Sequence, residues 1–200
     1  PSSRPVNAYT ICLTRARTAA LEARCREQEH TVSSAVMYTY GEALSQLLNR
    51  ENIFFACVFS GRTVPVGGMR DTVGCLVNAV PACYRRGESV REFFQGTLQA
   101  DLYSALPLRD ILLAAFGTLE LPAMAPDIDS LLMPVKEELD MAKPILALDY
   151  ARMPEGSFLW KADGCLHLTL RFPADKYDKD FTDALAARMA EAMIVGSGAL

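Results

Sequence analysis

Residues 53–81 read IFFACVFSGRTVPVGGMRDTVGCLVNAVP, and they contain two predicted strands and the turn between them. Residues 53–60 form a continuous apolar run, which is typical of a strand covered on both faces. Residues 61–70 hold three glycines and a proline, so they predict a loop. A second strand-like run follows over residues 73–84, and we expect Pro81 to break it. The segment therefore predicts two buried strands separated by a glycine-rich turn.

Toward the amino terminus, signals for one strand and two helices precede this segment. Residues 6–13 contain β-branched and aromatic side chains in a short run and predict a strand. Thr14 is a suitable N-cap for a helix over residues 15–29. Thr31 can cap a second helix, whose apolar residues recur with a period of about 3.6 residues. Residues 49–52 are polar and are expected to end it.

Beyond the two central strands, the chain continues with helical signals. Ser89 and Glu92 stand three residues apart and predict a capping box, at the start of a helix that reaches about Leu102. Residues 107–116 predict another helix, because proline is tolerated at a first helical position. Residues 117–142 contain repeated prolines and an acidic patch. We expect them to form an irregular crossover with one short helix.

The last quarter of the chain predicts more strands and a closing helix. Strands are expected at residues 144–150, 157–161 and 164–172, and the turn at residues 162–164 suits a hairpin. A helix is expected over residues 178–194, where apolar side chains recur every four residues. Strands alternate with helices along the chain, so the predicted class is α/β, with a mixed sheet flanked by helices in a single lobe.

Composition excludes several classes of protein. Half of the 200 residues are apolar and 22% are charged, which argues against disorder. The net charge of −4 disfavours a nucleic-acid binder, because no basic surplus is available to neutralise phosphates. No apolar run approaches the roughly 20 residues of a membrane span, so we expect a soluble protein without a membrane partner.

The six cysteines do not follow a metal-binding or redox pattern. No CxxC pair occurs, and most of the cysteines stand inside apolar runs. Zinc sites and redox motifs use closer spacings, and a chain of this size does not need a disulfide scaffold. We therefore expect buried free thiols in a reducing cytoplasm, and no bound metal.

Only two histidines are present, and neither belongs to a convincing catalytic constellation. His30 stands at the junction between two predicted helices, where an exposed polar ring is ordinary. His167 shares a face of its predicted strand with Cys165 and Thr169. Histidine is the commonest general base near neutral pH, so His167 is the alternative catalytic candidate. Neither His30 nor any aspartate stands at a suitable spacing from His167, so we interpret His167 first as a structural residue of the sheet.

Asn78 is the single amide in the second strand of the opening segment. Burying an amide without partners costs a few kcal/mol, so this side chain needs hydrogen bonds. Two interpretations stay open: Asn78 bonds the backbone as a structural residue, or it faces a substrate.

The same segment resembles a known family. FSGR at residues 59–62, followed by a glycine and proline loop and VGCLVNAVP at residues 73–81, is similar to the carboxy-terminal half of a nonribosomal peptide synthetase condensation domain. Such domains commonly read SGR, a loop and then (I/V)GxFVNTxPxR. YSALPLRDIL at residues 103–112 resembles the next motif of the family. Ala79 stands where the family usually has threonine, and no RDxSxxPL motif follows.

The resemblance implies one lobe of a chloramphenicol-acetyltransferase-like fold, extending over residues 1–200. Two such lobes form a V, and amide formation between carrier-bound thioesters takes place in the tunnel between them. The family's HHxxxDG motif belongs to the amino-terminal lobe and is absent from this chain, so no catalytic residue is expected here. The resemblance places Asn78 near the tunnel. It implies that Arg62, together with Gly61 and Gly74, helps to brace the cleft.

The resemblance also implies partners and alternatives. The expected partners are an amino-terminal condensation lobe, peptidyl or acyl carrier proteins and an adjacent adenylation domain. No cofactor is expected on this chain, because phosphopantetheine enters only on the carrier proteins. An isolated lobe is expected to expose an apolar cleft face and to self-associate. The alternatives are a lobe of a related acyltransferase that uses alcohols, or a non-catalytic docking module.

Overall fold

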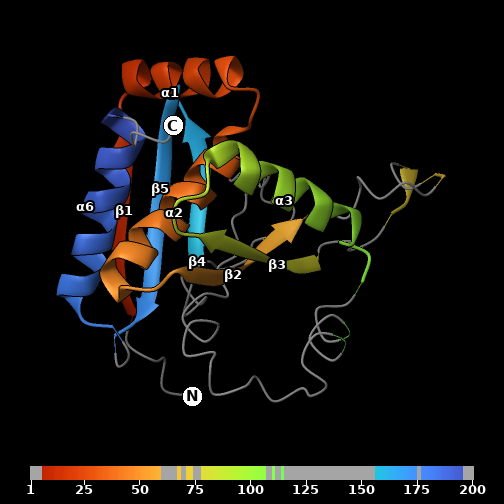
Figure 1. Cartoon of the computed structure of the whole chain (residues 1–200). Coiled ribbons are helices and arrows are strands. Elements are labelled where there is room, and N and C mark those ends of the chain that lie inside the picture. Colours follow the sequence, from red (N-terminus) through yellow and green to blue (C-terminus); the bar gives the residue numbers. More distant parts are fainter. Residues whose placement is uncertain are drawn as a thin grey trace.

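The computed structural model describes residues 6–59, 67–68, 71–73, 78–106, 110, 114, 156–174 and 177–195. Figure 1 shows their helices and strands. In chain order these are β1 (Val6–Leu13), α1 (Arg15–Glu27), α2 (Val32–Leu48), β2 (Asn52–Phe59), β3 (Asn78–Arg85), α3 (Val90–Leu102), β4 (Gly156–Ala162), β5 (Cys165–Pro173) and α6 (Lys179–Val195). The predicted α/β class is confirmed, but the described strands form two separate antiparallel sheets and not one mixed sheet.

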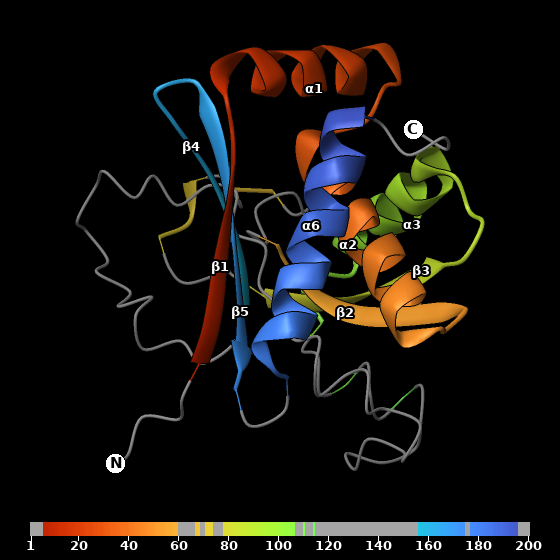
Figure 2. The same cartoon turned by 90° about the vertical axis from the view of Figure 1, so that its left-hand side faces the viewer.

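One sheet joins the two ends of the chain. Its strand order is β1-β5-β4, and both ladders are antiparallel. Strand β5 alternates between buried and half-buried residues, with Leu166, Leu168, Leu170 and Phe172 in the core. Helices α2 and α6 lie on one side of this sheet, while α1 crosses one end of it (Figure 2). The period-two pattern of β5 thus turns its leucines toward the helices.

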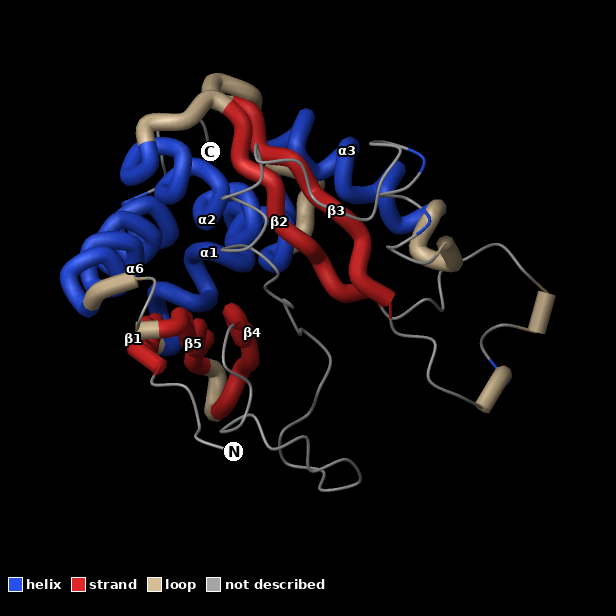
Figure 3. Tube along the Cα trace, turned by 90° about the horizontal axis from the view of Figure 1, so that it is seen from below, coloured by secondary structure: helices blue, strands red, loops and turns tan. Residues whose placement is uncertain are grey.

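Strands β2 and β3 form a separate antiparallel hairpin. Figure 3 shows this hairpin running beside α2 and α3, apart from the three-stranded sheet. An aromatic cluster joins the hairpin to the helices: Tyr38 of α2 meets Tyr84 of β3 edge-on, with ring centroids 5.3 Å apart. Phe93 of α3 lies 6.0 Å from Tyr38 in the same manner. Helix α2 therefore packs between the two β layers, with α6 on one side and α3 on the other.

The predicted helix caps are confirmed. Thr14 and Thr31 each accept a backbone hydrogen bond at the start of α1 and α2. Ser89 and Glu92 form the expected capping box of α3, in which each side chain binds the other residue's backbone N–H. These bonds lower the pKa of the Glu92 carboxyl, because the N–H and hydroxyl of Ser89 stabilise its charged form. Helix α1 ends at Glu27, before Glu29, which adopts a left-handed backbone.

Two details of the predicted strands are wrong. Val73 lies outside any strand and is 98% exposed, and the described part of β3 begins at Asn78. Pro81 does not break β3 but pairs with Ala56 inside the ladder. Among the described strands, β3 is paired only with β2. Proline has no backbone N–H, and this removes no ladder bond where its nitrogen faces the edge away from the paired strand.

Several other predictions concern residues outside the described part of the chain. Only Asp110 and Ala114 are described within the helix expected at residues 107–116, and both are helical. The crossover at residues 117–142 and the strand at residues 144–150 lie outside the described residues. The closing helix is confirmed as α6, and the hairpin turn at residues 162–164 is confirmed between β4 and β5. Among the described helices, none has the length and apolar character to cross a membrane.

Candidate functional site

The sequence resemblance implies four cleft residues, and the structure describes one of them, Asn78. Arg62, Gly61 and Gly74 lie outside the described residues. Asn78 is described through its backbone, as the first residue of β3. It pairs with Phe59, the last residue of β2, so this pair closes the ladder where the chain leaves β2 and returns to β3. The candidate site is therefore the loop end of the β2–β3 hairpin, at the Phe59–Asn78 pair.

The strand that carries Asn78 is held by a row of buried neighbours. Alternate residues of the two strands are buried, namely Ile53, Phe55, Cys57, Val80, Ala82 and Tyr84. The ring of Phe55 stacks on Phe93 of α3 at 6.1 Å and meets Tyr40 of α2 edge-on at 5.4 Å. Position 78 lies two residues before Val80 in the same ladder. The packing of the buried row thus fixes the backbone of the strand that begins at position 78.

Cys57 pairs with Val80, two residue pairs inside that end of the ladder, and is a packing residue rather than a nucleophile. Its thiol is buried and donates to the thioether of Met37, with 3.0 Å between the sulfur atoms. Burial raises its pKa to about 12, because the charged thiolate is poorly solvated there. The thiol therefore stays protonated at neutral pH, and its role near the site is packing.

Tyr38 of α2 contacts the β2–β3 hairpin through the ring of Tyr84. Its hydroxyl donates to the backbone carbonyl of Glu88 at 2.8 Å, which links α2 to the turn between β3 and α3. Burial, followed by the neighbouring Tyr84, raises the pKa of Tyr38 well above its ordinary value. The phenol thus stays neutral and serves as a fixed hydrogen-bond donor rather than an acid or base.

His167, the alternative catalytic candidate, is the third residue of β5. It is half-buried and stands opposite Cys12 of β1 and Trp160 of β4. On the same face of the ladder, the hydroxyls of Thr10 and Thr169 are 2.8 Å apart. Because His167 belongs to the three-stranded sheet and Asn78 to the separate hairpin, no ladder brings the two candidates together.

The environment of His30 differs from the expected one. The ring was expected to be exposed, but His30 is buried. Its Nδ1 lies 3.2 Å from the carbonyl oxygen of Thr31, and its Nε2 lies 3.0 Å from Oε1 of Gln28. Both ring nitrogens therefore have local partners at the α1–α2 junction, because the chain reverses there and folds the ring inward. His30 is a structural residue of that junction.

The expectation of buried thiols holds only in part. Cys25 and Cys57 are buried and free, whereas Cys12 is exposed on β1, and Cys83 and Cys165 are half-buried. Cys12 is exposed because alternate residues of an edge strand face away from the helices. Among the residues that the structure describes, no group of three or more His, Cys, Asp and Glu side chains is suited to a metal ion.

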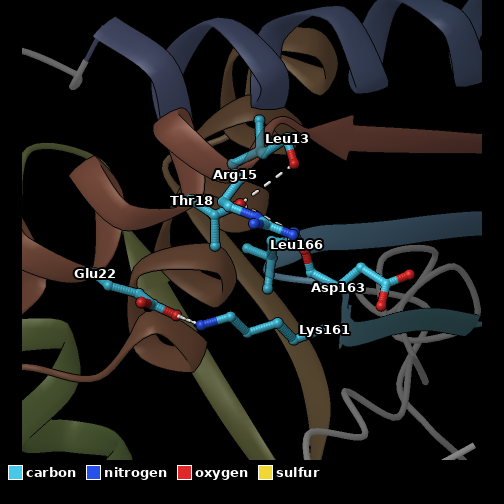
Figure 4. Close-up of polar contacts among 7 residues, drawn as sticks. All are labelled: Leu13, Arg15, Thr18, Glu22, Lys161, Asp163 and Leu166. Atoms are coloured by element: carbon cyan, nitrogen blue, oxygen red, sulfur yellow. Dashed lines mark hydrogen bonds and ion pairs between the residues drawn. The ribbon is translucent and has the colours of Figure 1, made fainter.

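Sequence reasoning missed the contacts that seat α1 on the β4–β5 hairpin (Figure 4). The guanidinium of Arg15 donates two hydrogen bonds to the carbonyl of Asp163, at 3.2 and 2.9 Å. Asp163 and Gly164 have φ values of 50° and 77°, as a type I′ turn requires. Lys161 and Glu22 add an ion pair between β4 and α1. These partners are more than 130 residues apart in sequence, so no local pattern announces them.

Thr18 is the buried residue among these contacts of α1. Its hydroxyl donates to the carbonyl of Leu13 at 3.3 Å and accepts the backbone N–H of Leu166 at 3.0 Å. One side chain of α1 thereby joins the last residue of β1 to the second residue of β5. We infer that Thr18 fixes the position of α1 relative to the end of the three-stranded sheet.

Replacing Thr18 by valine should lower the free energy of unfolding by about 1–3 kcal/mol, because the buried N–H of Leu166 loses its acceptor. The matched control is Thr39→Val, since Thr39 is equally buried but only donates to the carbonyl of Ala35, four residues back in α2. Removing that bond leaves no buried donor unpaired, so we expect a smaller loss of about 0.5–1 kcal/mol, the net contribution of an ordinary hydrogen bond. Urea denaturation of both variants measures the difference, and equal losses would contradict the role of Thr18.

Sequence comparisons relate parts of this chain to peptide synthetases. No family model matches the chain. It is 29% identical over 94 residues to nonribosomal peptide synthetase sidC of Aspergillus fumigatus, which covers 44% of this chain and 2% of that protein. It is 28% identical over 109 residues to tyrocidine synthase 2 of Brevibacillus parabrevis, covering 52% of this chain and 3% of the synthase. The chain thus spans a small fraction of these curated relatives.

Structural comparisons extend over the whole chain. A four-domain nonribosomal peptide synthetase matches 94% of this chain with 17% of its own, at a TM-score of 0.73 and 13% identity. The condensation domain of the Monacolin K polyketide synthase MokA matches the full chain with 49% of its own, at 0.70 and 13% identity. PapA2 acyl transferase matches 96% of the chain with 45% of its own, at 0.70 and 15% identity. The fold is therefore that of about half of a condensation domain.

Proposed function

Because the chain is a condensation-domain-like fragment, we propose that it forms the carboxy-terminal lobe of a nonribosomal peptide synthetase condensation domain. In this role it contributes to amide-bond formation between acyl or aminoacyl thioesters held on carrier proteins. The lobe supplies one wall of the substrate tunnel, and an amino-terminal lobe with the HHxxxDG motif supplies the catalytic histidine.

Two observations support the proposal: the sequence relatives are peptide synthetases, and the fold match covers all of this chain but only 49% of a condensation domain. A match to half of a domain leaves room for a second lobe of similar size. The chain has no HHxxxDG motif, in agreement with this division. The proposed partners are therefore an amino-terminal condensation lobe, carrier proteins and an adjacent adenylation domain, acting in the cytoplasm.

The sequence relatives favour amide formation over transfer of the acyl group to an alcohol. The sequence relatives named above are peptide synthetases, at 28–29% identity. The acyl transferase is similar in fold, at 15% identity. A shared fold hosts several chemistries, so the sequence likeness carries more weight for the reaction.

Within the proposed lobe, Asn78 is assigned to the tunnel wall, and Arg62, Gly61 and Gly74 to bracing the cleft. Support for Asn78 comes from its backbone position at the loop end of a hairpin whose buried row is packed against α2 and α3. An amide there offers both a donor and an acceptor to a substrate amide or to the facing lobe. No cofactor is assigned to this chain, and phosphopantetheine is proposed to enter on the carrier proteins.

The proposal is tested by the rate of amide formation in the full-length protein that contains this chain, with aminoacyl donor and acceptor loaded on their carriers. Asn78→Ala should lower the rate about 10- to 100-fold, because a misplaced substrate loses alignment with the reacting groups. Asn52→Ala is the matched control, since Asn52 is exposed at the opposite end of the same ladder. We expect its rate to stay within about twofold of the unsubstituted protein.

Two further arms separate the alternatives. Mass spectrometry of the product distinguishes an amide from an ester. An ester would indicate instead that the chain is a lobe of an acyltransferase that uses alcohols. The 200-residue chain alone should form product about 10²- to 10⁴-fold more slowly than the complete domain, the contribution typical of a missing general base. Full activity of the chain alone, or equal rates for both asparagine variants, would overturn the assignment made here.

A further inference from the structure

The three-stranded sheet has an outer face, on the side away from α2 and α6 (Figure 2). Residues of the opposite face, such as Ile11 and Leu168, are buried. The alternate positions of β1 and β5 form what we call the outer row, namely Ala8, Thr10, Cys12, Cys165, His167, Thr169 and Arg171. The outer row contains no aspartate or glutamate, so no carboxylate of β1 or β5 opposes a negative charge on this face.

A thiol and an imidazole stand directly opposite each other in the outer row, because Cys12 of β1 pairs with His167 of β5. The neighbouring pair on the same face is Thr10 and Thr169, whose hydroxyl oxygens lie 2.8 Å apart. Pairs two residues apart in an antiparallel ladder have the same hydrogen-bonding type and spacing. Directly opposite Cβ atoms are about 4.5–5.5 Å apart. The Cys12 thiol and the His167 ring therefore come within reach of each other by rotation of their side chains.

Cys12 also differs from the other described cysteines in its access to solvent. It is exposed, whereas the others are buried or half-buried, namely Cys25, Cys57, Cys83 and Cys165. The residues before and after it in β1, Ile11 and Leu13, are 6% and 2% exposed, so the strand beneath the thiol is held by the core. A thiolate is the nucleophilic form of cysteine, and a neighbouring imidazole is a base that can produce it. A fixed strand thus presents a nucleophile and its base to solvent.

We propose that Cys12 accepts acyl groups from thioesters, with His167 as its base. His167 takes the proton of the Cys12 thiol, and the resulting thiolate attacks the carbonyl carbon of the thioester. A bond forms between Sγ of Cys12 and that carbon, and the bond between the carbon and the donor's sulfur breaks. The departing thiolate receives the proton from His167. One thioester replaces another, so the exchange consumes no further reactant and is reversible.

The identity of the donor rests on the proposed function, in which the substrates are carrier-bound thioesters, whereas the Cys12–His167 pair does not depend on it. Under this assignment the chain holds an acyl group covalently on its outer sheet face. That site is separate from the candidate site at Asn78, because Asn78 belongs to the other sheet. The acyl group is therefore transferred to Cys12 without any residue of the β2–β3 hairpin.

Incubation of the 200-residue chain with S-acetyl-N-acetylcysteamine, a soluble thioester, tests the proposal. Peptide mass spectrometry measures the rate of acetylation at each cysteine. Cys12 should be acetylated, and His167→Gln should lower its rate at least about tenfold, because the thiol loses its base. Cys25 and Cys57 are buried in the folded chain, so acetylation of these two reports unfolding in the same sample. Thr169→Val, which changes the same face without removing a base, is the control and should leave the rate unchanged.

A relocated thiol provides the second measurement. Thr10→Cys combined with Cys12→Ser keeps an exposed thiol on the same strand and face but places it opposite Thr169. Diagonal neighbours are about 7–8 Å apart, so His167 serves this thiol poorly. The relocated thiol should be acetylated at least about tenfold more slowly than Cys12.

Three outcomes would overturn the proposal: no acetylation of Cys12, an unchanged rate in His167→Gln, or an equal rate at the relocated thiol. Each of these is read in a chain whose buried cysteines stay unmodified, which shows that it is folded. The measurement uses neither carrier proteins nor a second lobe. Its failure would therefore leave the proposed amide formation standing, and a failure of amide formation would leave acyl transfer to Cys12 standing.

Discussion

Leu170→Ala is expected to lower the free energy of unfolding by about 3–5 kcal/mol, the upper part of the range for a buried leucine. Leu170 has no exposed surface and lies in the central strand of the three-stranded sheet, between Tyr9 of β1 and Ser157 of β4. Both neighbouring strands are hydrogen-bonded to β5, so the backbone around the site cannot collapse to fill the cavity. The loss combines the transfer energy of the removed atoms with the cost of that cavity.

The matched control for Leu170 is the same substitution at Leu98, which is 51% exposed on α3. Leu98→Ala should change the free energy of unfolding by no more than about 0.5 kcal/mol. Guanidinium denaturation followed by circular dichroism, at a concentration where the chain is monomeric, compares the two. Similar losses at both positions would show that β5 is not the centre of the core.

Gly41→Ala is expected to lower the free energy of unfolding by about 1–3 kcal/mol, because it overpacks the contact between α2 and β3. A Cβ at Gly41 would lie 2.4 Å from Cβ and 2.7 Å from Cγ of Tyr84, closer than real side-chain contacts allow. Tyr84 is buried and edge-on to Tyr38, so its ring has little room to move. The clash exceeds the gain in helix propensity, which is about 1 kcal/mol.

The matched control for Gly41 is Gly96→Ala, the same substitution in another helix. No atom lies within 4 Å of the Cβ that it adds, so helix propensity should raise the free energy of unfolding by about 0.5–1 kcal/mol. Opposite signs at the two glycines are the expected result, measured by urea denaturation of the monomer. A stabilising Gly41→Ala would show that α2 sits farther from β3 than described here.

Local features of the fold were predictable from short stretches of sequence. The caps at Thr14, Thr31 and Ser89 depend on one side chain and a backbone N–H two or three residues away. The Asp163–Gly164 turn depends on two residues that tolerate a left-handed backbone. In such cases the interacting groups are near neighbours in the chain, so residue order contains the whole interaction.

The candidate site was predictable only as a family resemblance. FSGR and VGCLVNAVP suggested a strand, loop and strand with Asn78 in the second strand, and the structure has the β2–β3 hairpin there. The two histidines show the limit of the same reasoning. The burial of His30 depends on how the chain reverses between α1 and α2, which its polarity alone does not reveal.

The sequence by itself determined the α/β class, the capped helix starts and the leucine face of β5, because hydrophobic periodicity and capping act over a few residues. Only the tertiary structure decided that Thr18 bridges Leu13 and Leu166, and that Tyr84 leaves no room for a side chain at Gly41. The Thr18–Leu166 and Gly41–Tyr84 contacts join elements distant in the chain. Their geometry follows from how the layers pack against one another, which residue order alone does not specify.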